Sequence, residues 1–359
     1  MTNMGINRRE FLLSASATMI TAVSAGISAK SLRNSFGIAW TSVPLRIRQA
    51  SQNNPAKKPV LPADDFIELC YSFGAGGVQM GFDQLAEDDS DYLKSIRSLL
   101  ESREMYLELG VSAKALENED AFARVASVAN QLGVERLRVA CLSGRRYETF
   151  STMKDWQTFA DHWKQVLSKS EPMLKKYKLR VGVENHKDWL ADEQVEILKS
   201  ISSPYLGACV DFGNNVALLE DSLEFARKLA PYVVTTHLKD MAVKPYDDGF
   251  ELSEVPLGEG STPLKQIVKV LRKAQRDVPL CLEMITRDPL KVPYKTDKYW
   301  ATYPQRDNTR IQKFERSVLS KSWTKPLPRI SGLNNEQALA VENDNIRKCA
   351  EYAKNHLGI

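Results

Sequence analysis

Short apolar runs alternate with amphipathic stretches along the chain from residue 36 onward. Eight of these runs are rich in apolar and β-branched residues and have the length of strands: Phe36–Trp40, Gly77–Phe82, Tyr106–Val111, Leu137–Leu142, Leu179–Glu184, Gly207–Asp211, Val233–Leu238 and Pro279–Ile285. Most are followed by a stretch of helical periodicity: Asp64–Ser72, Ser90–Glu104, Asn118–Leu132, Asp155–Tyr177, Asp192–Ser200, Glu220–Leu229 and Pro263–Arg276. Apolar strands separated by helices predict a parallel sheet that is covered by helices.

Eight such units predict an α/β fold of the (β/α)8 type, a TIM barrel. A doubly wound open sheet is the alternative, but no G-x-G-x-x-G motif follows the first strand. One long loop, Thr41–Pro62, follows the first strand, and a long insertion, Arg287–Leu333, separates the eighth strand from the last helix, Asn335–Leu357. Both leave the active face of the predicted barrel, so each either lines the site or covers the surface. The insertion holds aromatic residues that would suit stacking on sugar rings: Tyr294, Tyr299, Trp300 and Tyr303.

The first 29 residues resemble a twin-arginine export signal. Arg8 and Arg9 precede Phe-Leu-Leu and a mildly apolar run, Ser14–Ile27, that is rich in Ala, Ser and Thr. That run is shorter than the roughly 20 residues that a membrane span requires, so no stable span is expected. Cleavage after Ala25 or after Ala29 fits the sequence, and residues 30–359 are expected to form a single barrel domain in the periplasm or cell envelope.

The composition is that of an ordinary globular protein and excludes several classes of function. Of the 359 residues, 49 are Lys or Arg and 45 are Asp or Glu, which gives a net charge of +4. Because no basic stretch is segregated, this small excess argues against a nucleic-acid partner. The five cysteines are widely scattered, so we expect free thiols and no disulfide framework. Only four histidines are present, which are too few for a multi-histidine metal cluster.

Four successive strands end in residue types that bind metal ions: Glu184, Asp211, His237 and Glu283. Asp211 follows Glu184 by 27 residues, and His237 follows Asp211 by 26, as in ordinary βα repeats. Glu283 comes 46 residues later, after an extra loop, Ala242–Thr262. Because consecutive barrel strands lie side by side, the four side chains can converge on one point. Three carboxylates and one imidazole predict a site for Mn²⁺, Mg²⁺ or Co²⁺, with Zn²⁺ also allowed.

The alternation of side chains along the strands extends this candidate site. Residues two positions before each candidate ligand share its face and are all small: Gly182, Cys209, Thr235 and Cys281. They leave room for a site where large apolar side chains would fill the barrel. His186 and Lys239 lie two positions after candidate ligands and share the same phase, so we expect them to contact substrate.

Other residues at strand ends leave two interpretations open. Trp40 ends the first strand and either forms the floor of a sugar site or packs in the core. Arg145 and Arg146, just past the fourth strand, either grip substrate or are solvated charges. His162 and His356 lie in helical stretches and are expected to have no role in the site.

Taken together, these motifs resemble the xylose-isomerase-like barrel superfamily. The resemblance rests on Val-Glu-Asn-His, Val-Asp-Phe-Gly-Asn, Thr-His-Leu-Lys-Asp, Gly258-Glu259-Gly260 and Leu-Glu-Met, and it is strongest between Arg180 and Ile285. Within the superfamily, the likeness is to sugar phosphate isomerase/epimerase-type proteins, which include ketose 3-epimerases, inosose dehydratases and hydroxypyruvate isomerases.

The resemblance implies roles for individual residues. Four would ligate one divalent metal ion: Glu184, Asp211, His237 and Glu283. Two of these ligands, Glu184 and Glu283, would also form the acid–base pair, while His186 and Lys239 would contact substrate. Glu259 would lie near the pocket on a turn. Asn214 is a further candidate for substrate contact, but it stands where related epimerases and DNA-repair endonucleases often have His, so the epimerase contacts do not transfer directly.

The expected function is therefore that of an exported, divalent-metal-dependent isomerase or epimerase. It would act on a sugar or keto-sugar by proton abstraction through an enediolate. One alternative is a lyase, hydratase or hydrolase of keto-glycosides that uses the same site, and another is a non-catalytic sugar-binding barrel. The expected partner is a small carbohydrate, and the sequence leaves open whether the chain forms a homo-oligomer.

Overall fold

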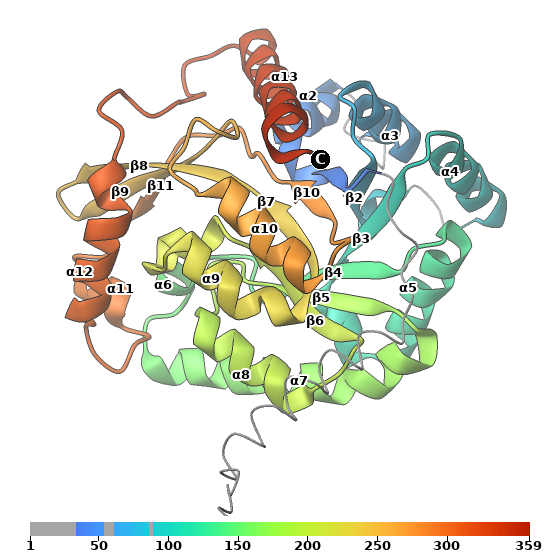
Figure 1. Cartoon of the computed structure of the whole chain (residues 1–359). Coiled ribbons are helices and arrows are strands. Elements are labelled where there is room, and N and C mark those ends of the chain that lie inside the picture. Colours follow the sequence, from blue (N-terminus) through green and yellow to red (C-terminus); the bar gives the residue numbers. More distant parts are fainter. Residues whose placement is uncertain (1–33, 54–60, 86–88) are drawn as a thin grey trace, which may run out of the picture. The chain divides into compact units, whose positions relative to one another are not determined.

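Eight parallel strands close into a barrel in this computed structural model, which describes residues 34–53, 61–85 and 89–359 (Figure 1). The strands are β1 (Phe36–Ala39), β2 (Gly77–Gly81), β3 (Tyr106–Ser112), β4 (Arg136–Ala140), β5 (Arg180–Glu184), β6 (Leu206–Asp211), β7 (Val233–Leu238) and β10 (Leu280–Leu282). Their order around the barrel is β1-β10-β7-β6-β5-β4-β3-β2, and β1 closes it by pairing with both β2 and β10. The TIM-barrel prediction is confirmed.

Most of the helices surround the barrel because they bury an apolar stripe against its strands, while α6, α11 and α12 pack in a second core. They are α2 (Pro44–Asn53), α3 (Ala63–Ser72), α4 (Ser90–Ser102), α5 (Glu119–Leu132), α6 (Arg146–Thr149), α7 (Met153–Tyr177), α8 (Ala191–Ile201), α9 (Ser222–Leu229), α10 (Leu264–Ala274), α11 (Asp297–Trp300), α12 (Asn308–Ser317) and α13 (Asn335–Tyr352). Short turns are η1 (Trp40–Ser42), η2 (Phe82–Gln84), η3 (Ala113–Glu117), η4 (Asn214–Leu218), η5 (Ala230–Tyr232), η6 (Leu319–Lys321) and η7 (Ala353–Leu357). Side chains at the N-caps fix several helix starts: Asp89 of α4, Asn118 of α5, Thr152 of α7 and Asp221 of α9.

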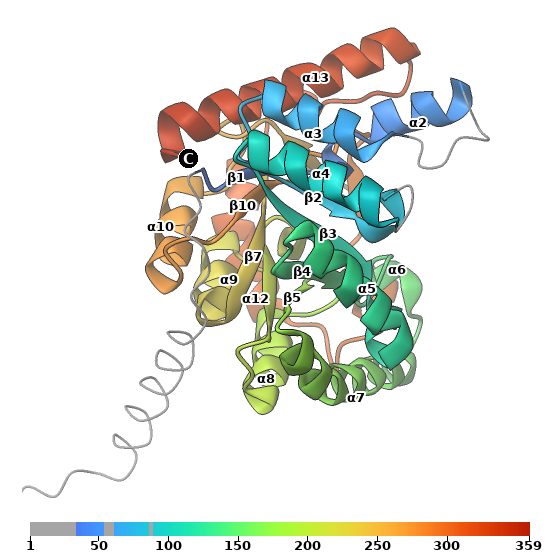
Figure 2. The ribbon, with the colours of Figure 1, turned by 90° about the vertical axis from the view of Figure 1, so that its right-hand side faces the viewer.

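The segment expected as a loop after the first strand contains a helix. α2 begins at Pro44, which suits the first helical turn because its missing N–H would have no partner there. Two of its free N-terminal amides, those of Leu45 and Arg46, donate to the Glu342 carboxylate of α13 at 2.7 and 3.1 Å. Figure 2 shows α2 and α13 side by side on the outside of the barrel.

Two segments expected as loops, Ala242–Thr262 and Arg287–Leu333, combine into a second, smaller sheet. β8 (Asp240–Tyr246) and β9 (Gly249–Val255) form an antiparallel hairpin, and β11 (Leu290–Val292) pairs with β9. Figure 1 shows this sheet with α11 and α12 at one side of the barrel. The aromatic residues of the insertion are buried in their own core: Tyr294, Tyr299, Trp300 and Tyr303. They are packing residues, and the stacking role considered for them is wrong.

Arg146 joins this insertion to the barrel. Its buried guanidinium lies 3.7 Å from the ring centre of Trp156 and 4.4 Å from that of Tyr303. It donates to the carbonyl of Thr302 at 2.8 Å and to the Glu193 carboxylate at 2.8 Å. The neighbouring Arg145 is partly exposed and pairs with Glu148, so neither arginine faces the strand-end carboxylates described below.

The predicted export signal, residues 1–29, and the boundary at residue 30 lie outside the described residues. Among the residues described, the helices lack the combination of length and apolar character that a membrane-spanning segment needs. The five cysteines are free thiols, as the sequence predicted.

Candidate metal centre

Four side chains converge above the barrel axis from the ends of neighbouring strands: Glu184, Asp211, His237 and Glu283. One potential ligand atom from each lies within 4.8 Å of all the others, and all four residues are buried. His237 Nδ1 lies 3.5 Å from Glu184 Oε2, 3.5 Å from Asp211 Oδ2 and 3.4 Å from Glu283 Oε2. The parallel register explains the convergence, because Asp211 pairs with His237, and His237 pairs with the residue two before Glu283.

The imidazole of His237 is oriented by residues deeper in the barrel. Its Nε2 lies 2.7 Å from Gln79 Oε1, an acceptor, so Nε2 carries the proton of that hydrogen bond. Gln79 Nε2 donates in turn to Glu108 Oε2 at 3.1 Å, which also accepts from Thr235 Oγ1 at 2.7 Å. The buried Nδ1 has no hydrogen-bond partner. An orphaned nitrogen that faces three carboxylate oxygens fits a divalent cation.

Gln79 and Glu108 were not predicted from the sequence. Gln79 lies within the apolar run of β2 and Glu108 within that of β3, and both are buried. A polar residue inside an otherwise apolar strand is the signal that could have identified them.

Substitution of Gln79 by Met should weaken metal binding. The variant removes the acceptor that fixes the ring of His237, and loss of such partners typically costs about 10–100-fold in metal affinity. Titration calorimetry with Mn²⁺ measures the effect, and Gln312→Met on the exposed face of α12 is the matched control. An unchanged Mn²⁺ affinity in Gln79→Met would contradict the positioning role.

Both candidate acid–base residues are held by cations and remain ionised. Arg138 of β4 donates to Glu184 Oε2 through Nε and pairs with the same oxygen through Nη2. Burial alone would raise the pKa of Glu184, but the charges of Arg138 and His237 outweigh it and hold that pKa below its usual range. Burial likewise opposes ionisation of Glu283, and the charges of His237 and Lys239 lower its pKa well below the usual value. Thr41 Oγ1 donates to Glu283 Oε1 at 2.8 Å.

Lys239 and Asn214 lie within this cluster. The Lys239 ammonium lies 2.9 Å from Asp211 Oδ2 and pairs with Glu283. Asn214 Nδ2 donates to Glu184 Oε1 at 3.0 Å, and its Oδ1 accepts from Lys239 at 3.2 Å. The Asp211 carboxylate also accepts from the Asn214 amide at 2.9 Å, which fixes the start of η4.

The other three predicted substrate contacts have different environments. Burial lowers the pKa of His186 to about 4, so this imidazole is neutral near pH 7 and lies in the field of Glu184. Trp40 packs edge-on against Phe66 in the core, with ring centres 4.9 Å apart. Glu259 is on an exposed turn, and its carboxylate faces Lys348 of α13 at 3.8 Å. The structure therefore does not bring Trp40 or Glu259 to the four candidate ligands.

The Gly258-Glu259-Gly260 segment has a structural explanation. The Asp240 carboxylate accepts from the amides of Gly258 at 2.9 Å and Gly260 at 3.0 Å. Gly258 has a φ of +89°, and a Cβ there would lie 2.2 Å from the Tyr352 ring. Only glycine fits this turn, so the motif positions backbone and directs Glu259 outward.

Asp188 is a buried carboxyl outside the predicted set. Its Oδ1 accepts from the Trp189 amide at 2.8 Å, and its Oδ2 has no partner. Burial raises the pKa of Asp188 to about 7 from its ordinary value of 3.8. Between these values the folded state binds more protons than the unfolded state, so the free energy of unfolding should fall as the pH rises.

Asp188→Asn should remove this loss of stability, because an amide does not ionise. Its oxygen can still accept from the Trp189 amide, so the local structure should persist. We expect the metal-free variant to gain about 2–4 kcal/mol in free energy of unfolding at pH 8, and little at pH 4. Urea denaturation at both pH values measures this, with the exposed Asp192→Asn as the control. A gain at pH 8 no larger than at pH 4 would refute the assignment.

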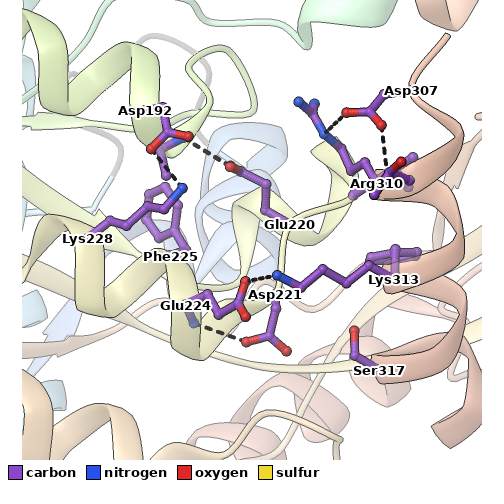
Figure 3. A pocket seen from close by; sticks show the side chains of 14 residues that line it. Asp192, Glu220, Asp221, Glu224, Phe225, Lys228, Asp307, Arg310, Lys313 and Ser317 are labelled. Carbon is purple, nitrogen blue, oxygen red and sulfur yellow. Dashed lines mark hydrogen bonds and ion pairs between the residues drawn. The ribbon is translucent and has the colours of Figure 1, made fainter.

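A separate pocket of about 230 Å³ lies outside the barrel between α8, α9 and α12 (Figure 3). Each of its basic side chains is paired: Lys228 with Asp192 at 2.7 Å, Lys313 with Glu224 at 2.5 Å, and Arg310 with Asp307 at 3.5 Å. These cations are therefore already compensated by carboxylates of the pocket.

Comparisons with known proteins agree with the barrel fold. The sequence matches the xylose isomerase-like TIM barrel family over residues 67–303. A curated relative, 3-oxo-isoapionate decarboxylase of Pectobacterium atrosepticum, is 30% identical over 114 residues, which are 31% of this chain and 42% of the relative. The match thus spans less than half of that relative's length.

Solved structures share the fold at low sequence identity. D-psicose 3-epimerase in the presence of D-fructose aligns with a TM-score of 0.60 at 14% identity, covering 90% of this chain and 100% of that chain. IolI protein with a bound zinc atom aligns with a TM-score of 0.51 at 14% identity, covering 81% and 100%. At identities this low, the structural alignments show a common fold alone.

Proposed function

The chain belongs to the xylose isomerase-like TIM barrel family, and from that premise we propose that it is a divalent-metal-dependent isomerase or epimerase of a sugar or keto-sugar. The observation that carries the proposal is the convergence of two ionised carboxylates: Glu184 lies 3.5 Å and Glu283 lies 3.4 Å from His237 Nδ1. Those carboxylates, with Asp211, offer the oxygen ligands that Mn²⁺, Mg²⁺ and Co²⁺ prefer, and Zn²⁺ also accepts such a set.

The chemistry follows from the residues around this pair. A bound divalent ion would polarise the carbonyl and an adjacent hydroxyl of the substrate, which makes the neighbouring C–H more acidic. One of the two carboxylates would take this proton, leaving an enediolate, and the other, after it has been protonated from solvent, would return a proton. Return of the proton to the opposite face of the same carbon inverts its configuration, which is epimerisation. Return of the proton to the neighbouring carbon moves the carbonyl group, which is isomerisation.

Positioning of the two carboxylates supports these roles. Arg138 and Asn214 hold Glu184, and Thr41 holds Glu283 from the side of β1. The neutral His186 and the Lys239 ammonium lie beside the pair, where they can donate to substrate oxygens. Export by the twin-arginine route is part of the proposal and depends on residues 1–29 alone.

A second candidate is a lyase that uses the same carbanion. After proton abstraction, a leaving group on the next carbon can depart, as from a 3-keto-glycoside. The partial match to a decarboxylase favours keeping this candidate, since loss of CO₂ from a β-keto acid also produces an enolate. A non-catalytic sugar-binding barrel is less well supported, because binding alone does not require two buried, ionised carboxylates at one metal centre.

Solvent exchange tests the proposal. Purified protein is analysed for metal and then incubated in D₂O with a panel of ketoses, keto-glycosides and keto-acids, with Mn²⁺, Mg²⁺, Co²⁺ or Zn²⁺ added. Carbon-bound deuterium together with an isomer or epimer supports the proposal. Release of an aglycone or CO₂ without an isomer selects the lyase. Absence of both metal binding and exchange would reject a metal-dependent enzyme.

A further inference from the structure

Each carboxylate oxygen that faces His237 Nδ1 is already paired with a cation. Arg138 contacts Glu184 Oε2, while Lys239 contacts Asp211 Oδ2 at 2.9 Å and Glu283 Oε2. A metal ion that binds these oxygens must share them with both cations or displace both. In either case Arg138 and Lys239 lose much of the negative charge that stabilises them in a buried site.

Lys187 is a third buried cation, and it has no carboxylate partner among the described residues. Lys187 lies three residues after the end of β5 and is only 4% exposed. Its ammonium donates to Oδ1 of Asn214, an uncharged acceptor. Lys239 donates to the same oxygen at 3.2 Å, so two ammonium groups share one amide oxygen. An uncharged amide oxygen does not compensate the positive charge of two buried ammonium groups, so their position is suited to an anion.

The backbone at Lys187 is also unusual. Its φ of +62° lies in the left-handed region, which residues with a side chain rarely adopt. The surrounding structure stabilises this conformation, since the Lys187 carbonyl accepts from the Arg146 amide at 3.0 Å. Four other described residues with side chains share a positive φ, so the inference rests on the burial and the contacts of Lys187.

We propose, on the premise of the function above, that the substrate carries a carboxylate or phosphate group and that Lys187 and Lys239 bind it. Lys187 is then a specificity-determining residue that selects sugar acids or sugar phosphates over neutral ketoses. Asn214, which stands between the two ammonium groups, holds them in place for the anion.

Binding measurements test this without relying on turnover. Mn²⁺ is titrated into the full chain first, followed by a keto-sugar acid (5-keto-D-gluconate), a ketose phosphate (D-fructose 6-phosphate) or the neutral D-fructose. At least one anionic probe should bind the Mn²⁺-loaded protein about tenfold more tightly than D-fructose. The probe that binds more tightly identifies the anionic group as a carboxylate or a phosphate.

Variants locate the anion. Lys187→Met should abolish the preference for the anion and leave Mn²⁺ affinity within about twofold, because Lys187 contacts none of the candidate ligands. Lys178→Met is the matched control, since Lys178 also has a positive φ, of 55°, but is exposed at the end of α7. It should retain the wild-type preference.

The outcomes separate the two proposals. Mn²⁺ binding with no gain in affinity for either anion, or an unchanged preference in Lys187→Met, would overturn the anionic-substrate inference and leave the proposed function intact. Absence of Mn²⁺ binding, together with absence of deuterium exchange, would overturn the proposed function itself. Lower affinity for both Mn²⁺ and anion in Lys187→Met would indicate disruption of the whole site and would also contradict the inference.

Discussion

Glu283→Gln is expected to lower kcat/KM for the keto-sugar substrate by about 10³–10⁴-fold, the largest effect that we predict for a single substitution. The amide removes a charged ligand of the candidate metal centre and one member of the acid–base pair in a single change. The amide oxygen still accepts from Thr41 Oγ1, so the local fold should persist. Initial rates, solvent deuterium exchange and metal content of the purified variant measure the separate losses.

A matched control keeps this test specific. Glu351→Gln alters the same residue type on the exposed face of α13, where the carboxylate pairs with Arg347, and it should retain wild-type kinetics. A kcat/KM within tenfold of wild type in Glu283→Gln, with substrate deuteration still occurring, would rule out Glu283 as a member of the acid–base pair.

Arg146→Met should reduce the free energy of unfolding by about 3–5 kcal/mol, the largest stability effect expected outside the barrel core. The methionine retains part of the packing between Trp156 and Tyr303 but donates no hydrogen bonds. The carbonyl of Thr302 then loses a buried donor, and Glu193 loses its cationic partner. Urea denaturation and thermal unfolding, both followed by circular dichroism, measure the loss.

The adjacent arginine provides the comparison. Arg145→Met removes a cation that is partly exposed and pairs with Glu148 three residues along, so the expected cost is about 1 kcal/mol or less. If the two variants unfolded at the same urea concentration, Arg146 would not be the attachment that joins the insertion to the barrel.

The barrel itself was predictable because buried parallel strands leave a strong local signal. β5 and β6 are apolar runs that end in one acidic residue, β7 carries His237 next to its last residue, and the alternation of side chains directed Glu184, Asp211 and His237 to one point. The second sheet was not predictable in the same way. β8 and β9 contain several charged residues and Pro245, so their segment resembles a polar loop, and their pairing with β11 depends on distant chain segments.

Site residues that depend on distant partners were also missed. Nothing local distinguishes Lys187 from a solvated loop lysine, and its hydrogen-bond partner Asn214 is 27 residues away in the sequence. Arg138 lies at an intermediate position of β4, and its role depends on Glu184 of the next strand. The outward direction of Glu259 is likewise set by Asp240 and Tyr352, which are remote in sequence.

The closure of the barrel also determines the order in which the chain can fold. β1 pairs with β10 between Phe36 and Leu280, and α2 is capped by Glu342, 297 residues from Leu45. During synthesis, one edge of β1 therefore stays unpaired until about three-quarters of the chain has left the ribosome. Nascent chains that end before residue 280 should be aggregation-prone and depend on chaperones, whereas chains that extend beyond α13 can close and become protease-resistant.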